Sequence, residues 1–150
     1  VDGIVYACMP LVHDGNIVDR FWLKFEKGRI VDFGAERGEE ILRNVIETDE
    51  GSHYLGEVAL VQYDSPIRAL NTLFFDTLFD ENASCHLAIG RAYPLLDGAD
   101  NLSDEELAAR GVNFSGEHVD FMIGTRDLSV DGIKQDGTVV PVFRHGNFAF

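Results

Sequence analysis

The segment VDRFWLKFE, residues 18–26, has a two-residue repeat that a β-strand can use to bury one face. Phe21, Leu23 and Phe25 take every second position, and successive side chains of a strand point to opposite faces. Asp14-Gly15-Asn16 is a hairpin-turn signal that joins this strand to an earlier apolar run, IVYACMPL. With a further short strand, RIVDF, the first third of the chain is predicted to form antiparallel strands.

Helical patterns are few. From Glu36 to Thr48 apolar residues recur about once per helical turn between charged ones, which predicts an amphipathic helix packed on the strands. Ser103 and Glu106 have the spacing of a capping box that opens a second, short helix over SDEELAAR. The Phe-rich stretch NTLFFDTLFD does not favour either type of structure.

The remaining apolar runs are short and bounded by turn residues. LGEVALV, CHLAIGRAY and HVDFMIG are predicted strands, and the C-terminal region is predicted to be a strand, a turn-rich hairpin and a strand, with turn signals at Asp131-Gly132 and Asp136-Gly137. The pattern predicts an α+β fold with a mixed, largely antiparallel sheet and few helices, forming a single domain over residues 1–150. Because Val1 falls inside a strand-like pattern, we interpret the chain as the C-terminal fragment of a longer one.

Charge and hydropathy exclude several classes of partner. Twelve basic and 26 acidic residues give a net charge of −14, and no Lys/Arg cluster could neutralise a row of phosphates, so nucleic acid is not an expected partner. No run approaches the roughly 18 apolar residues of a membrane span, and the N-terminus has no secretory signal pattern. The two cysteines are too few for a disulfide framework, which favours a reducing, cytoplasmic location.

Four polar residues stand in apolar strand patterns where an uncompensated charge is costly. Glu57 interrupts LGEVALV, His86 begins HLAIG, and His118 and Asp120 share one face of HVDFMIG because they are two residues apart. A bound cation would compensate them. Two histidines and two carboxylates on separate strands suit a divalent transition metal such as zinc, cobalt or manganese.

Each of these residues also has a simpler interpretation. Glu57 could face water on an edge strand, and His118 with Asp120 could be a surface pair. It is the occurrence of all four in glycine-flanked apolar strands that favours the metal site.

The neighbours of His86 raise further possibilities. Cys85 would point away from His86 in a strand, so packing is favoured over a nucleophilic role. Tyr93 is predicted to end the strand, as a core residue or as a hydrogen-bond donor to an oxyanion. Asp80 and Glu81 are predicted to orient ligands or to cap the turn, and a hydrogen bond to a ligating histidine is an alternative.

The segments YLGEVALVQYDSPI, TLFDENASCHLAIGRAY and HVDFMIG together resemble the C-terminal part of the thermophilic metallo-aminopeptidase family, the group of aminopeptidase T, aminopeptidase S and PepS. The resemblance covers essentially all 150 residues. It implies a catalytic-domain fragment of a two-domain metallo-aminopeptidase with two divalent metal ions. It also implies a cytoplasmic homodimer that acts on peptides with a free N-terminus.

The resemblance assigns roles to particular residues. Its implied metal ligands are Glu57, His86, His118 and Asp120, and its implied active-site residue is Tyr93. The mechanism would be two-metal activation of water, with Glu57 bridging the ions and Tyr93 donating a hydrogen bond to the developing oxyanion. The family's remaining glutamates lie upstream of the VDG segment with which this chain begins, so we expect the fragment alone to be nearly inactive.

Two functions of other classes remain open at this point. The chain could be a non-catalytic dimerisation or binding module with an acidic surface. It could also be a cysteine amidohydrolase that uses Cys85 with a histidine. Metal binding with activity would favour the metallo-aminopeptidase, whereas inhibition by thiol alkylation and not by chelators would favour the cysteine enzyme.

Overall fold

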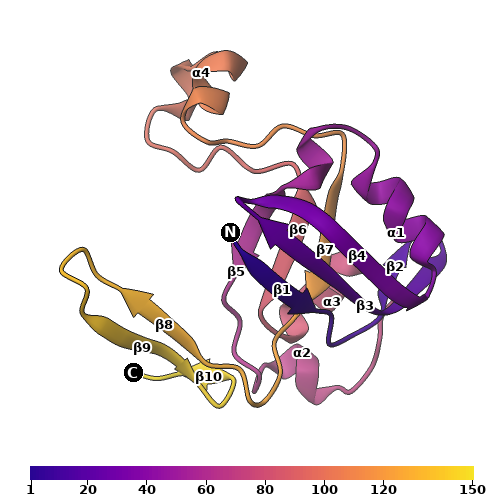
Figure 1. The fold of residues 1–150 in the computed structure, drawn as a ribbon. Helices are drawn as coiled ribbons and strands as arrows, with labels where there is room; N and C mark the ends of the chain where they lie inside the picture. Colours follow the sequence, from indigo (N-terminus) through magenta and orange to yellow (C-terminus); the bar gives the residue numbers. More distant parts are fainter.

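A computed structural model describes all residues, 1–150, and its N-terminal part is a four-stranded antiparallel sheet (Figure 1). The central strand β3 pairs with each of the others, and it buries Phe21, Leu23 and Phe25 on one face as the two-residue repeat predicts. The four strands are β1 (Gly3–Tyr6), β2 (Leu11–His13), β3 (Asn16–Glu26) and β4 (Arg29–Arg37). The predicted hairpin turn lies at Asp14-Gly15, between β2 and β3.

Helix α1 (Glu39–Ile46) packs on this sheet, as its periodicity predicts, but it is shorter than the predicted Glu36–Thr48 because β4 extends to Arg37. Its buried residues are Leu42, Val45 and Ile46. They join the apolar side chains of β3 in one hydrophobic cluster. A single 3-10 turn, η1 (Gly51–His53), then leads into the second sheet.

The second sheet is antiparallel, in the order β5 (Leu55–Ala59), β6 (His86–Gly90) and β7 (His118–Met122). One face carries Leu87, Ile89, Val119 and Phe121, which belong to the same hydrophobic cluster as α1 and β3. The rings of Phe21 and Phe121 have their centroids 5.5 Å apart, which joins the two sheets through an aromatic contact. The opposite face of this sheet is therefore free to carry polar side chains.

Short elements connect the strands. Between β5 and β6 they are α2 (Pro66–Ala69), α3 (Thr77–Asp80) and η2 (Glu81–Ala83), and between β6 and β7 they are η3 (Ala99–Asn101) and α4 (Asp104–Ala109). The Phe-rich stretch thus ends in the single helical turn α3. The capping box of Ser103 and Glu106 is present at α4, as predicted.

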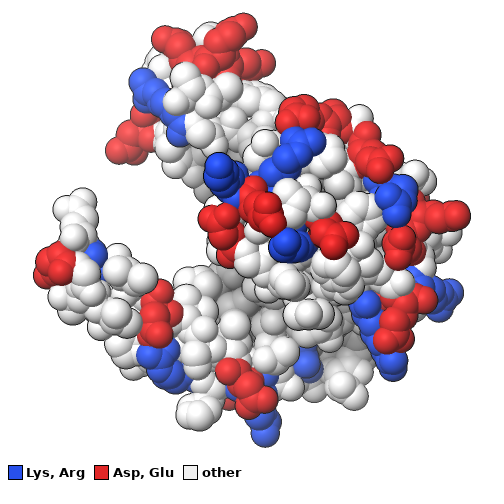
Figure 2. All heavy atoms as spheres, in the orientation of Figure 1, with Lys and Arg blue, Asp and Glu red and all other residues white.

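Two segments project from the body in Figure 1. One is the region around α4, whose first turn carries Asp104, Glu105 and Glu106, part of the acidic surface seen in Figure 2. The other is a hairpin of β8 (Val130–Ile133) and β9 (Val139–Arg144), to which β10 (Asn147–Phe148) adds a short third strand. No helix is both long and apolar enough to cross a membrane.

Three local expectations were wrong. The predicted α+β class with antiparallel strands and few helices is confirmed, but the strands form three separate sheets and not one mixed sheet. Asp131-Gly132 lies inside β8, paired with Pro141 and Val140 of β9, and the chain turns at Asp136-Gly137. The strand predicted over CHLAIGRAY ends at Gly90, where a φ of +96° breaks the extended conformation, so Tyr93 lies in the following loop.

Candidate metal centre

The polar face of the β5–β6–β7 sheet brings Glu57, His86, His118 and Asp120 together. Strand pairing places Glu57 opposite Ala88, and Ala88 opposite Asp120, so the two carboxylates lie on one line across the sheet. His86 and His118 stand two residues before Ala88 and Asp120 on their strands, and so share their face. Ala88, fully buried between the carboxylates, fills little of the space between them.

Gly56 allows Glu57 to face the site. The register of β5 against β6 shifts between Leu55 and Glu57, which is a β-bulge. Without the bulge these two residues would share a face; with it, Leu55 packs against the hydrophobic cluster while Glu57 faces Asp120. A Cβ on Gly56 would lie 2.2 Å from the carbonyl oxygen of Arg91, so the bulge requires glycine at this position.

The ring orientations of both histidines are set by backbone carbonyls. Nδ1 of His86 lies 3.1 Å from the oxygen of Ser84, and Nδ1 of His118 lies 2.7 Å from the oxygen of Arg91. Because a carbonyl only accepts, each Nδ1 carries a proton, and in the neutral ring Nε2 is left with a lone pair. This is the arrangement found in metal-ligating histidines.

Each Nε2 faces carboxylate oxygens. Nε2 of His86 is 3.4 Å from Oε1 of Glu57, and Nε2 of His118 is 3.6 Å from Oε2 of Glu57 and 3.5 Å from Oδ1 of Asp120. A lone pair that faces an anionic oxygen is stable only with a proton or a cation between the two atoms. The carboxylate of Glu57 thus presents a different oxygen to each histidine.

Glu81 is a further member of the cluster that the sequence placed only as an orienting or capping residue. The cluster contains two groups of candidate ligands, and within each group the ligand atoms all lie within 4.8 Å of one another. Glu57, His118 and Asp120 form the first group, and Glu81, His86 and Asp120 form the second. Asp120 belongs to both. Glu81 reaches the site from η2, and its sequence signal is its place five residues before His86.

The electrostatics of the cluster favour a cation. Burial raises the pKa of Asp120, and the nearby charge of Glu57 raises it further, against the lowering influence of the two histidines. Burial likewise raises the pKa of Glu81, with the charge of Asp120 adding to it. Oδ1 of Asp120 is buried and accepts no hydrogen bond, and a carboxylate oxygen in that state is costly unless an ion binds it.

The donor set therefore fits a divalent transition metal. Imidazole nitrogens and carboxylate oxygens are ligands of zinc and of related ions. Ions of this kind bind their ligands at about 2 Å, which puts ligand atoms of one ion about 3 to 4 Å apart. The distances of 3.4–3.6 Å between the histidine and carboxylate atoms have this spacing.

The site is open to solvent on one side. The Glu57 side chain keeps 34% exposure, whereas that of His86 keeps 4%, so the accessible side of the cluster is that of β5. Tyr93 lies in the loop after β6, 64% exposed, with its ring 5.3 Å from the His118 ring in an edge-on arrangement. The structure thus places Tyr93 beside the cluster, although not at the end of a strand.

Cys85 has partners other than the neighbouring histidine. Its thiol is buried and donates to the carbonyl oxygen of Val61, and burial raises its pKa. A buried, protonated thiol is a poor nucleophile. Asp80 is also buried, and its carboxylate accepts from the backbone N–H of Phe74, which caps the turn before α3 as one of the predicted alternatives has it.

The fold and the cluster define a candidate metalloenzyme domain. The chain belongs to the thermophilic metalloprotease (M29) family, whose family model matches residues 1–148. This confirms the family resemblance inferred from the sequence motifs.

Similar proteins of known name support the same family assignment. The chain is 60% identical to aminopeptidase AmpS of Bacillus subtilis (strain 168) over 100% of its length, and 49% identical to aminopeptidase T of Thermus aquaticus over 99%. The solved structure of wild-type AmpT from Thermus thermophilus matches with a TM-score of 0.90 and 45% identity over 99% of this chain. The chain spans 37%, 36% and 36% of these three proteins, respectively.

Proposed function

We propose that this chain carries the metal centre of an aminopeptidase that removes N-terminal residues from peptides. The observation that carries the proposal is the cluster of two histidines and three carboxylates in two groups that share Asp120. The names of the relatives point to the same reaction. Because the chain spans little more than a third of them, the activity is proposed for the whole protein to which this domain belongs.

The proposed cofactors are two divalent ions, zinc, cobalt or manganese. His118 would hold one ion through Nε2, with Glu57 and Asp120. His86 would hold the other, with Glu81 and Asp120. Glu57 would also contribute to both sites, because its two oxygens face different histidines.

When bound, the ions supply the Lewis acidity that activates water and polarises the scissile carbonyl. The residues of this chain position the reactants. Tyr93, exposed beside His118, is proposed to donate a hydrogen bond from its hydroxyl to the carbonyl oxygen as negative charge develops on it. The free, uncharged amine of a peptide N-terminus would join Glu57, His118 and Asp120 as a further nitrogen donor, which would account for a preference for the N-terminus.

A cytoplasmic location and a homodimeric assembly complete the proposal. The first rests on the two unpaired cysteines. The second rests on the family resemblance and would be checked by the molar mass of the purified protein in solution.

Titration of the chelator-treated full-length protein with Co²⁺, followed by hydrolysis of a peptide and of its N-acetylated form, tests the proposal. We expect two equivalents of metal to bind, with cleavage of the free peptide and not of the acetylated one. Glu57→Gln is expected to abolish cleavage and to keep the fold. A protein that binds no metal would support the binding module, and inactivation by thiol alkylation but not by chelators would support the cysteine enzyme.

A further inference from the structure

The dipeptide Gly90-Arg91 contacts both neighbouring strands that carry candidate ligands. The carbonyl oxygens of its two residues lie against Gly56, where a Cβ would be 2.4 Å from the oxygen of Gly90 and 2.2 Å from that of Arg91. The oxygen of Arg91 accepts the hydrogen bond from Nδ1 of His118. A movement of this peptide would therefore change the positions of both Glu57, next to Gly56, and the His118 ring.

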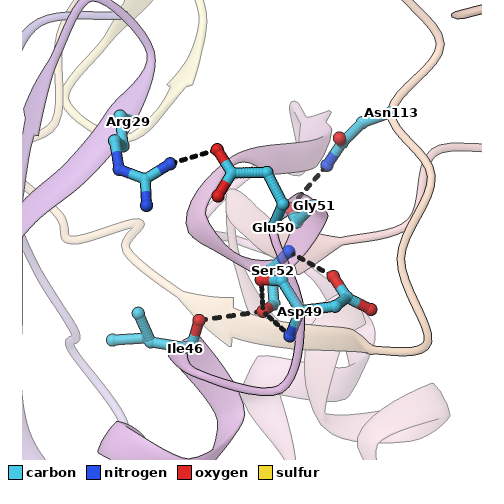
Figure 3. Close-up of polar contacts among 7 residues, drawn as sticks. All are labelled: Arg29, Ile46, Asp49, Glu50, Gly51, Ser52 and Asn113. Carbon is cyan, nitrogen blue, oxygen red and sulfur yellow. Dashed lines mark hydrogen bonds and ion pairs between the residues drawn. The ribbon is translucent and has the colours of Figure 1, made fainter.

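The side chain of Asn113 holds this peptide. Its Nδ2 donates to the oxygen of Gly90 at 2.7 Å and to the oxygen of Gly51 at 2.8 Å. The backbone oxygen of Asn113 also accepts from the N–H of Ala92 at 2.9 Å. Figure 3 shows the amide of Asn113 pointing from its own loop toward Gly51 of η1.

Asn113 and η1 are themselves held in place. In Figure 3 the carboxylate of Asp49 accepts from the N–H of Ser52, next to Gly51. The other oxygen of Asp49 accepts from the N–H of Gly116 and the hydroxyl of Ser115, just after Asn113 in the chain. Asp49 therefore fixes the segments on both sides of the Asn113 amide, so that this amide keeps its position against the Gly90 oxygen.

We propose that Asn113 is a positioning residue of the metal centre, because it holds the Gly90-Arg91 dipeptide in place. The Arg91 carbonyl then keeps the proton of the His118 ring on Nδ1 and directs its Nε2 toward Glu57 and Asp120. This role rests on the proposed metal-dependent function. Among side chains of this size, only the amide of asparagine has an NH₂ group that donates to two carbonyls at once. Loss of a group that orients a ligating histidine typically weakens metal affinity about 10–100-fold.

The test compares Asn113→Ala and Asn113→Asp with two controls in the purified protein. Ala removes both donors, and Asp places a carboxylate against two carbonyl oxygens. Asn101→Ala changes an exposed asparagine of η3, and Val45→Ala lowers stability by truncating a buried side chain of α1 away from the cluster. The measurements are the Co²⁺ dissociation constant, from the visible absorption of bound Co²⁺, and the ¹⁵N resonances of the His118 ring in the metal-free protein.

Both Asn113 variants are expected to bind Co²⁺ about tenfold more weakly, because the carbonyl that orients His118 is displaced. The ¹⁵N resonances of their His118 ring are expected to shift away from those of a ring protonated only on Nδ1. Both controls are expected to keep wild-type values, even though Val45→Ala unfolds at a lower temperature. Unchanged affinity and ring resonances in the Asn113 variants would overturn the inference, and so would equal weakening by Val45→Ala. If the wild type itself binds no Co²⁺, the proposed function fails, and the ring resonances still decide the role of Asn113.

Discussion

Replacing Asp120 by asparagine should have opposite effects on stability with and without metal. In the metal-free protein Asp120 is 5% exposed, and its Oδ1 accepts no hydrogen bond. Burial raises its pKa, so the fold disfavours the charged form. That penalty is fully present above the folded pKa and disappears as the pH falls below the unfolded value of about 3.9.

The size of the expected change in the free energy of unfolding follows from the unpaired Oδ1 of Asp120. A buried acceptor without a donor costs about 1–3 kcal/mol, and the neutral amide that replaces the carboxylate relieves part of it. We expect Asp120→Asn to change the metal-free free energy of unfolding by between zero and about +1 kcal/mol at pH 7. For a chain of this size 1 kcal/mol corresponds to a rise of about 2–4 °C in the unfolding temperature.

Bound metal reverses the order of the unfolding temperatures of the wild type and the Asp120→Asn variant. A ligand present at 100 times its dissociation constant stabilises the folded state by about 2.7 kcal/mol, or about 5–11 °C on the same scale. Asp120 belongs to both groups of candidate ligands. The variant is therefore expected to lose most of this rise, so that it unfolds below the wild type in saturating metal.

Thermal unfolding followed by circular dichroism, in chelator and in Zn²⁺, measures both effects. Asp97→Asn, a change at an exposed aspartate outside the cluster, is the control and is expected to follow the wild type under both conditions. The reasoning is refuted if Asp120→Asn unfolds well below the wild type in chelator, or if its response to Zn²⁺ equals that of the wild type.

Three further outcomes are expected. Gly56→Ala should displace Glu57 and weaken Zn²⁺ binding, because the added Cβ would meet the Arg91 oxygen at 2.2 Å; calorimetric titration with an unchanged affinity would contradict this. Asp49→Asn should lower the urea midpoint at pH 7, because hydrogen bonds from the Gly116 N–H and its neighbours hold the pKa of Asp49 below its ordinary value. That stabilisation is present above about pH 3.9 and is lost as the pH falls through the folded pKa, so the difference between the two midpoints should shrink only below about pH 4; a difference equally large at pH 3 would be inconsistent with it. Cys85→Ala should keep peptidase activity at wild-type level in an assay with saturating metal. Loss of activity without a fall in stability would instead support the thiol mechanism.

Several features of the site follow from local pattern. His118 and Asp120 could be placed on one face from their spacing alone, because the side-chain repeat of a strand is two. Glu57 could be singled out because one acid in an apolar run is costly unless it is compensated. The motifs around these residues also identified the family, since the family model matches residues 1–148.

Other features depend on contacts between distant segments. The bulge at Gly56, which turns Leu55 to the core and Glu57 to the site, arises where the Arg91 carbonyl approaches, and no local pattern encodes that approach. The inclusion of Glu81 depends on how the connection between β5 and β6 folds back against β7. Strand register and loop path are long-range properties, so periodicity does not determine them.

The amino-acid sequence by itself determined the antiparallel strands, the amphipathic helix, and the residue types of a histidine–carboxylate metal site, because these are properties of spacing and charge along the chain. The tertiary structure alone decided that the strands form three sheets, that Ala88 lies between the carboxylates, and that Asn113 joins Gly51 to Gly90. The physical reason is that ligand geometry requires atoms from distant segments to lie within a few ångströms of one another, and only the packing of the whole core brings them that close.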